Sequence, residues 1–235
     1  MMSLIFVSLS WLSYGQVGYG PELGIGISTL KFAPPTYPIL YTSASVSPVI
    51  SGKIGGMTDV PLNKNIYFQA GISFSRKGAV KSFSYNHNDS FNESVNQTLY
   101  ISYFDLPLSV VYKTGMQGKG RFIAGIGATP SYIIGGHYKL QDIGHFNDTL
   151  FSFNENDKIV TGSTLSAFDI GVNLSAGYEF PTGLFFRLYG TFGINDIGIQ
   201  TEIDKNRMWG ISGGYILGKG RNINKDPDNL IDKTP

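Results

Sequence analysis

Cysteine is absent from this 235-residue chain, so neither a disulfide framework nor a thiolate metal site can form. Charge is scarce as well, because charged residues make up 15% of the sequence and the formal net charge is only +1. That balance gives no electrostatic footprint for nucleic acid or for a strongly acidic partner. Beyond the N-terminus no apolar run approaches the length of a membrane-spanning helix. The chain is therefore either exported and soluble or inserted in a membrane as strands.

Glycine and aromatic residues are the abundant types, with 30 glycines and 14% aromatic residues. Short segments rich in aromatic and β-branched residues favour β-strands, because these side chains suit a pleated surface. The sequence contains no repeat of fixed length, and its size suits one domain.

The N-terminus resembles a secretory signal peptide over residues 1–15. An apolar run, MMSLIFVSLSWL, precedes the small residues Ser13 and Gly15, and cleavage is expected before Gln16. A basic region ahead of the apolar run is missing, and the alternative is a buried N-terminal strand or helix. At the other end, residues 219–235 form a polar tail that we expect to be a periplasmic extension. The domain between them is expected over residues 16–218.

Alternation of apolar and polar residues with period two is the strongest pattern in the chain. In residues 168–180 every second side chain, from Phe168 to Phe180, is apolar, and the others are polar or glycine. Seven other segments alternate in the same way, some less cleanly. The eight predicted strands cover residues 19–30, 48–61, 66–77, 104–112, 120–136, 168–180, 184–195 and 208–217. Each is long enough to cross a membrane as a tilted strand.

The connections between these segments alternate in length. Those at 62–65, 114–120 and 181–183 are short, whereas the third and fifth connections, around 78–97 and 137–162, are long. Short turns at one end and long loops at the other are typical of an all-β, eight-stranded antiparallel up-and-down barrel of the bacterial outer membrane. In such a barrel the short turns and both termini lie in the periplasm, and the long loops are extracellular.

Alternation alone does not decide which face points inward, and a soluble lipocalin-like barrel shows the same period. Three features favour the membrane form. The predicted signal peptide places the chain outside the cytoplasm. The polar face is rich in glycine, which makes room inside a narrow barrel but only weakens a solvated strand. Aromatic residues also gather at the ends of the apolar faces, where they are expected to form interfacial girdles. The predicted girdle residues are Tyr112, Phe168, Tyr178, Phe180, Phe186 and Trp209.

Several stretches resemble the PorT-like outer-membrane β-barrel family, which is common in Bacteroidetes. They are GKIGGMTDVPLNKNIYFQAGISFSRKG at 52–78, YFDLPLSVVYK at 103–113, FIAGIGATPSYIIGG at 122–136 and FDIGVNLSAGYEF at 168–180. The resemblance covers about residues 17–217 and concerns structural patterns, so it specifies fold more strongly than function. It implies an outer-membrane location and a possible link to envelope or type IX secretion machinery, with which the founding member of the family is associated. The polar C-terminal tail departs from barrels that end on an aromatic residue.

A group of polar residues is predicted to point into the lumen. Its members are Glu22, Lys53, Asp59, Gln69, Tyr103, Asp105, Arg121, Asp169, Asn173, Glu179 and Arg187. One interpretation is an ion or proton path. The other, which we favour, is a structural plug, because an eight-stranded barrel is just wide enough for side chains to fill and near-balanced charges can pair. A plug argues against an open diffusion pore.

No catalytic, cofactor or metal site is predicted. The histidines His87, His137 and His145 fall in or beside the long connections. His137 near Ser131, or His145 near Asp148, forms a partial constellation that lacks a third orienting residue on a rigid strand. The segment HNDSFNES at 87–94 matches no calcium-loop spacing. We therefore expect a protein that is not an enzyme, although a lipid-modifying barrel enzyme stays an alternative.

The long connections 79–98 and 137–162 are the expected contact surfaces, because loops on a rigid scaffold usually carry binding. The first mixes aromatic and polar residues, as contact surfaces do. Asp148-Thr149-Leu150 also resembles a short O-glycosylation motif of Bacteroidetes envelope proteins. The functional hypotheses are a structural or binding barrel in contact with membrane lipid and an envelope partner, a small conducting barrel, and a barrel enzyme.

Overall fold

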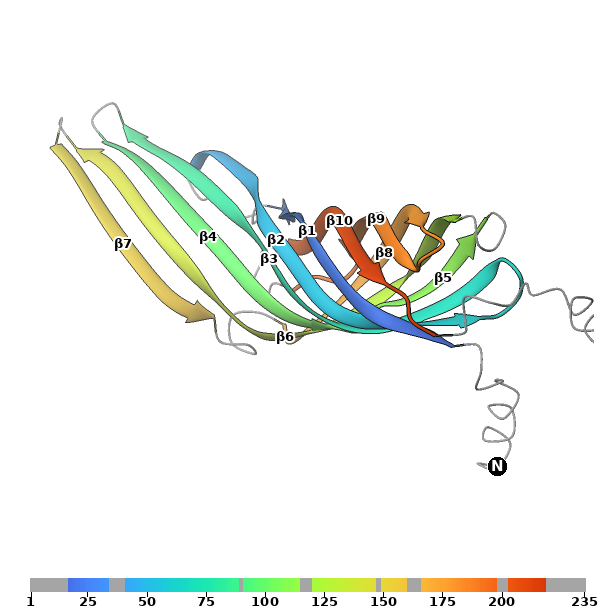
Figure 1. Ribbon diagram of the computed structural model, residues 1–235. Helices are drawn as coiled ribbons and strands as arrows, with labels where there is room; N and C mark the ends of the chain where they lie inside the picture. The colour runs from blue at the N-terminus through green and yellow to red at the C-terminus, as the bar shows by residue number, and fades with distance from the viewer. Residues whose placement is uncertain are drawn as a thin grey trace, which may run out of the picture.

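The computed structural model describes residues 17–33, 41–88, 91–114, 120–146, 149–159, 166–197 and 203–218, and it is all β (Figure 1). The strands are β1 (Gly18–Ala33), β2 (Tyr41–Pro61), β3 (Ile66–Asn88), β4 (Phe91–Asp105), β5 (Leu108–Lys113), β6 (Arg121–Phe146), β7 (Thr149–Ile159), β8 (Phe168–Glu179), β9 (Leu184–Gly193) and β10 (Ile203–Tyr215). The described residues include no helix long and apolar enough to cross a membrane.

The strands pair antiparallel in a closed ring. Chain neighbours pair around the sheet, and β1 closes the ring by pairing with β10 from Glu22↔Gly214 to Ala33↔Ile203. β4 and β5 are two halves of one strand, since both lie between β3 and β6 and only Leu106 and Pro107 separate them. Within the described residues β7 pairs with β6 and lies outside the closed ring. The ring therefore has the eight predicted positions, and the prediction of an up-and-down barrel is confirmed.

Apolar side chains cover the outside of the ring. Ile25 and Ile54 are 60% and 59% exposed, whereas Glu22 and Asp59 on the same strands are buried. This is the reverse of a soluble barrel, whose outer face must be polar. The arrangement excludes the lipocalin-like alternative and gives a wall that suits contact with lipid.

The connections at 62–65 and 181–183 form tight turns at one end of the ring, here called the turn end. Asn63 Oδ1 accepts hydrogen bonds from the backbone N–H groups of Asn65 and Ile66, at 2.9 and 2.8 Å. Gly183, with φ of +97°, ends the turn between β8 and β9 in a conformation that favours glycine. Short turns face the periplasm in barrels of this type, so the opposite end, the hairpin end, is extracellular.

The predicted long loops at 79–98 and 137–162 are wrong in part, because most of their residues continue the strands. β3 runs on to Asn88 and β4 begins at Phe91, while β6 extends to Phe146 and β7 follows from Thr149. In Figure 1 these hairpins project together beyond β8, β9 and β10. Outside the bilayer both faces of a hairpin meet water, so polar residues can occupy both, and the alternation that reveals a membrane strand is lost.

The predicted signal peptide (1–15) and polar tail (219–235) lie outside the described residues. Both stay predictions.

Candidate functional site

The barrel lumen is the place where the polar residues of the sequence meet. Period-two alternation sends one face of each strand inward, and the structure places all eleven residues that we assigned to the lumen on that inner face. Their contacts form three layers, which follow one another from the turn end toward the hairpin end.

The first layer, nearest the turn end, is centred on Lys113. Its Nζ lies 2.5 Å from Asp59 Oδ2 and 2.8 Å from Glu179 Oε2. Arg121 bonds the other oxygen of Glu179 at 2.6 Å and donates to Tyr67 Oη at 2.7 Å. Two cations and two carboxylates therefore balance in a layer that joins five strands.

The second layer is centred on Arg187, which forms a two-point bond to Glu22. Arg187 Nε and one terminal nitrogen lie 3.0 and 2.6 Å from the two Glu22 oxygens, and Lys53 Nζ lies 2.9 Å from Glu22 Oε1. Arg187 also donates to Gln69 Oε1 at 3.0 Å, and Gln69 in turn donates to Asp59 Oδ1 at 2.9 Å. Gln69 thereby links the first layer to the second.

The third layer surrounds Asp105 and Asp169. Asp105 accepts hydrogen bonds from Ser75 and Ser131 and lies 3.3 Å from Lys77 Nζ. Asp169 accepts a 2.8 Å bond from Asn206. Across the three layers, five basic side chains face five acidic ones. They are Lys53, Lys77, Lys113, Arg121 and Arg187 against Glu22, Asp59, Asp105, Asp169 and Glu179.

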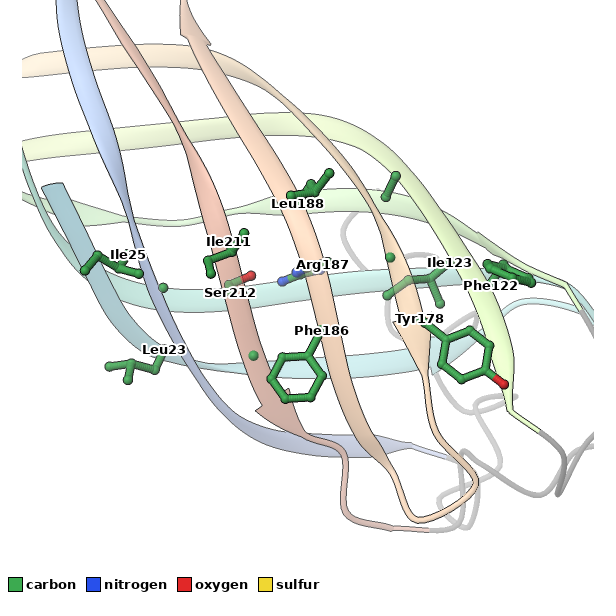
Figure 2. A pocket seen from close by; sticks show the side chains of 14 residues that line it. Leu23, Ile25, Phe122, Ile123, Tyr178, Phe186, Arg187, Leu188, Ile211 and Ser212 are labelled. Carbon is green, nitrogen blue, oxygen red and sulfur yellow. The ribbon is translucent and has the colours of Figure 1, made fainter. Parts of the chain in front are cut away.

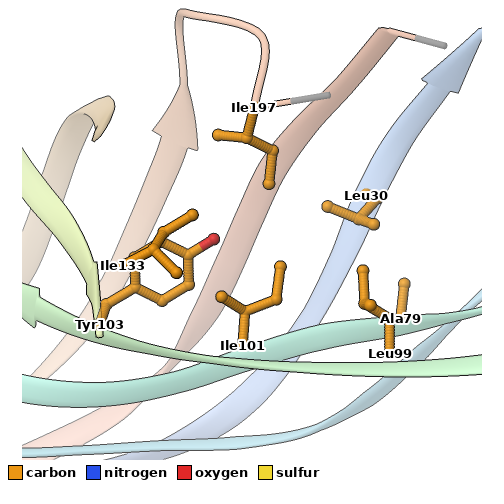
Figure 3. Close-up of a cluster of buried hydrophobic side chains, with 7 residues drawn as sticks. All are labelled: Leu30, Ala79, Leu99, Ile101, Tyr103, Ile133 and Ile197. Carbon is orange, nitrogen blue, oxygen red and sulfur yellow. The ribbon is translucent and has the colours of Figure 1, made fainter. Parts of the chain in front are cut away.

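An apolar cluster closes the lumen beyond the third layer, and we call it the apolar cap. It brings together buried side chains of β1, β3, β4 and β6 and of the segment after β9, which converge in Figure 3. The apolar cap consists of Leu30, Ala79, Leu99, Ile101, Tyr103, Ile133 and Ile197. Within the described part of the barrel, packed hydrocarbon thus follows the buried ion pairs along the lumen.

A small cavity remains between the second and third layers. Its volume is about 60 Å³, and Lys53, Lys77, Asp105, Asn173 and Tyr189 contribute to its lining. That volume holds a few water molecules and is far below the several hundred cubic ångströms of a small-molecule site.

Sequence reasoning missed several residues of the plug. Lys77 is the last residue of the predicted segment 66–77, on its inward row, and Lys113 directly follows the predicted segment 104–112. Following the alternation to the end of the first segment and one residue past the second would have found both. The apolar cap carried no such signal. Leu99 and Ile101 are apolar residues on an inner face, and an alternation rule that turns apolar residues outward cannot place them.

The histidines do not assemble a catalytic site within the described side chains. His137 is exposed on the outer face, whereas Ser131 is buried on the inner face and bonds Asp105, so the suggested pair is separated by the wall. The side chains of His87 and His145, and all of Asp148, lie outside the described part. Among the described residues, no group of three potential metal ligands occurs.

The predicted girdle residues line the outer wall. Tyr112, Tyr178, Phe180 and Phe186 lie toward the turn end, and Phe168 and Trp209 lie toward the hairpin end. Tyr178 packs edge-on against Phe122 and Phe180, with ring centroids 5.1 Å apart in each pair.

An open apolar groove of about 670 Å³ crosses the outer wall beside the turn-end residues Tyr178 and Phe186. Figure 2 shows Leu23, Ile25, Ile211, Phe186 and Leu188 around it. Gly213 and Ala176 leave the groove between these larger side chains, and in a bilayer such a surface is covered by hydrocarbon chains.

A closed antiparallel ring with an apolar outer wall and a polar, filled lumen is a transmembrane β-barrel. A family model described as "Outer membrane protein beta-barrel domain" matches residues 11–198. The chain belongs to this family, and it is a protein of the bacterial outer membrane.

Solved structures of outer-membrane proteins are similar to this chain at low identity. The attachment invasion locus protein Ail of Yersinia pestis is 13% identical, with 86% of this chain and 99% of that chain covered and a TM-score of 0.36. OprG of Pseudomonas aeruginosa is 10% identical, with 87% and 98% covered and a TM-score of 0.41. A search of curated proteins found no match.

Proposed function

We propose that this protein is a non-conducting, non-enzymatic barrel that anchors an extracellular β-sheet for binding. One observation carries the proposal: the lumen is filled, whereas the strand ladders continue past the barrel. β4 and β6 stay in register from Phe91↔Phe146 to Tyr100↔His137, and β6 and β7 from Phe146↔Thr149 to Gly136↔Ile159. A surface for a partner is thus available on the hairpins, while side chains fill the described interior around a cavity of about 60 Å³.

The backbone of β7 suggests how a partner would bind. Within the described part of the chain β7 pairs with β6 alone, so its other edge presents backbone N–H and C=O groups. Such an edge is a template on which an extended segment can add as a further strand.

Single-channel recording tests the closed lumen. Purified protein reconstituted in a planar bilayer is expected to show no stable unitary conductance, beside a porin of known conductance as positive control. Reproducible unitary steps would refute the non-conducting barrel and favour the alternative of a small transport channel.

A link to envelope or type IX secretion machinery is a further part of the proposal. It is supported by the resemblance of residues 52–78 and 103–113 to PorT-like barrels. The test is a host strain that lacks the chain, in which secreted proteins are compared before and after complementation. A secretion profile unaffected by loss of the chain would end this part of the proposal.

Two hairpin variants connect the partner surface to that assay. In the first, residues 141–154 are replaced by Asn-Gly, which joins the directly opposite residues Leu140 and Glu155 by a two-residue turn. In the second, residues 85–93 are replaced in the same way between Ser84 and Ser94. If β7 carries the contact, the first variant fails to complement and the second, its matched control, succeeds, with both folded barrels verified by their heat-modifiable migration.

A further inference from the structure

We propose that the outer wall at the hairpin end binds the phosphate groups of a glycolipid in the outer leaflet, through Lys31, Lys205 and Arg207. β1 and β10 place Lys31 directly opposite Lys205, and Arg207 lies opposite Thr29, one step toward the membrane. All three point away from the lumen, because their neighbours Leu30 and Asn206 are buried on the inner face. We call these three residues the basic triplet.

The basic triplet lies at the edge of the apolar wall. The next outward pair toward the bilayer is Ile27↔Trp209, and both of these side chains are exposed on the outer face. Two residues along a strand span about 7 Å, so Arg207 stands about one headgroup layer beyond Trp209. A lipid whose acyl chains cover Ile27 and Trp209 therefore brings its headgroup to the triplet.

Among the described residues, no ion pair compensates the cations of the triplet. Like charges directly opposite on neighbouring strands destabilise a sheet. The ion pairs among the described residues include none of the three, and the residue opposite Arg207 on β9 is Phe192. An anion between the strands removes this repulsion, and a phosphate can accept hydrogen bonds from all three side chains.

A second basic group occupies the corresponding position on β3, β4 and β6. Arg76 is the first outward residue of β3 beyond the exposed Phe74. Its guanidinium lies 4.4 Å over the Tyr100 ring, and one terminal nitrogen lies 3.3 Å from His137 Nε2. These contacts hold the planar donor group in place, and a fixed guanidinium suits a phosphate better than a free lysine.

The distribution of basic side chains points to the outer leaflet. Among the described side chains, Lys31, Arg76, Lys139, Lys205 and Arg207 face outward at the hairpin end. At the turn end, the exposed Lys64 lies in the loop between β2 and β3. The five side chains at the hairpin end thus place positive charge on the side of the barrel where the outer leaflet lies.

The test is binding of lipid A, a phosphorylated glycolipid, to the refolded full chain in detergent. Trp209 lies beside the triplet, and a Trp11→Phe background leaves it as the only tryptophan, so energy transfer to dansyl-labelled lipid A reports occupancy at this site. Each basic residue near an anionic surface contributes about fivefold in affinity. The triple variant Lys31→Gln, Lys205→Gln, Arg207→Gln is therefore expected to bind about 125-fold more weakly.

Three comparisons decide the outcome. Dephosphorylated lipid A is expected to bind the wild-type chain as weakly as intact lipid A binds the triple variant. Lys64→Gln, the matched control at the other end, is expected to keep wild-type affinity. Equal affinity for both lipids, unchanged affinity in a triple variant that is folded by its heat-modifiable migration, or full displacement of the lipid by millimolar inorganic phosphate would overturn the assignment to a lipid headgroup.

Discussion

Replacing Lys113 by methionine should destabilise the barrel severely. The Lys113 side chain is fully buried at 0% exposure, and its partners Asp59 and Glu179 are 1% and 3% exposed. Removing one partner of a buried ion pair costs about 3–5 kcal/mol, because the remaining charge is left without compensation. An exposed pair would cost less than about 1 kcal/mol. Glu179 keeps its bond to Arg121, so most of the loss arises at Asp59, which keeps only the Gln69 amide.

The assay is urea unfolding of the barrel in lipid vesicles, followed by tryptophan fluorescence and by migration on unheated gels. We expect Lys113→Met to lower the free energy of unfolding by about 3–5 kcal/mol. The double variant Lys113→Met, Asp59→Asn removes the uncompensated carboxylate and should recover a large part of that loss. A loss below about 1 kcal/mol in the single variant, or no recovery in the double variant, would refute the assignment of these residues to a buried plug.

Three further substitutions test other parts of the fold. Ile126→Arg, at the middle of the lipid-facing wall, should lower the free energy of unfolding by about 2–4 kcal/mol, as measured by urea titration in vesicles. In the same assay Tyr132→Arg, near the rim of the wall, should lower it by about 1 kcal/mol or less. Equal losses would contradict the proposed position of the bilayer. Ile101→Ala in the apolar cap should cost about 2–5 kcal/mol, and Ile134→Ala on the outer wall clearly less, so similar losses would argue against a packed cap. Gly26→Ala should reduce the yield of the heat-modifiable folded form, because an added Cβ would lie 2.8 Å from Gly210 Cα where β1 pairs with β10 and closes the ring. The control Ser212→Ala lies on the same strand pair and removes a hydroxyl that has no hydrogen-bond partner among the described residues, so it should fold normally.

The membrane part of each strand was predictable because one physical constraint acts on it. Lipid outside and a narrow lumen inside impose a period of two, and the predicted segments 168–180 and 184–195 end within two residues of β8 and β9. The constraint ends where the bilayer ends. β3 continues from the predicted limit at Lys77 to Asn88. Ala79 and Lys81 are still buried on its inner face there, but beyond the bilayer no lipid requires an apolar outer row, so the sequence no longer alternates between polar and apolar residues.

The sequence predicts which residues face the lumen, but it does not predict which of them form ion pairs with one another. Alternation turns Glu22 and Arg187 inward, yet their pairing depends on the relative height of β1 and β9, which follows from the registers of both with β10. Shifts of register between neighbouring strands change the relative height of the side chains that they carry. The ladder between β4 and β6 shifts at Ser102/Tyr103, and Gly135 at this point has φ of +149°. Beyond the shift, Leu99 and Ile101 face the lumen and His137 faces outward, which the alternation pattern alone did not reveal.

The ion pairs of the lumen connect residues that are distant in sequence. Glu22 and Arg187 are separated by 165 positions, and Lys113 lies 54 from Asp59 and 66 from Glu179. None of these bonds can form within an isolated hairpin, so we expect them to form after the transition state of folding. Interactions that are absent from the transition state affect the unfolding rate much more than the folding rate. The plug therefore contributes kinetic stability. It has little effect on the folding rate, but it slows unfolding, because the assembled barrel must break its ion pairs before β1 can separate from β10.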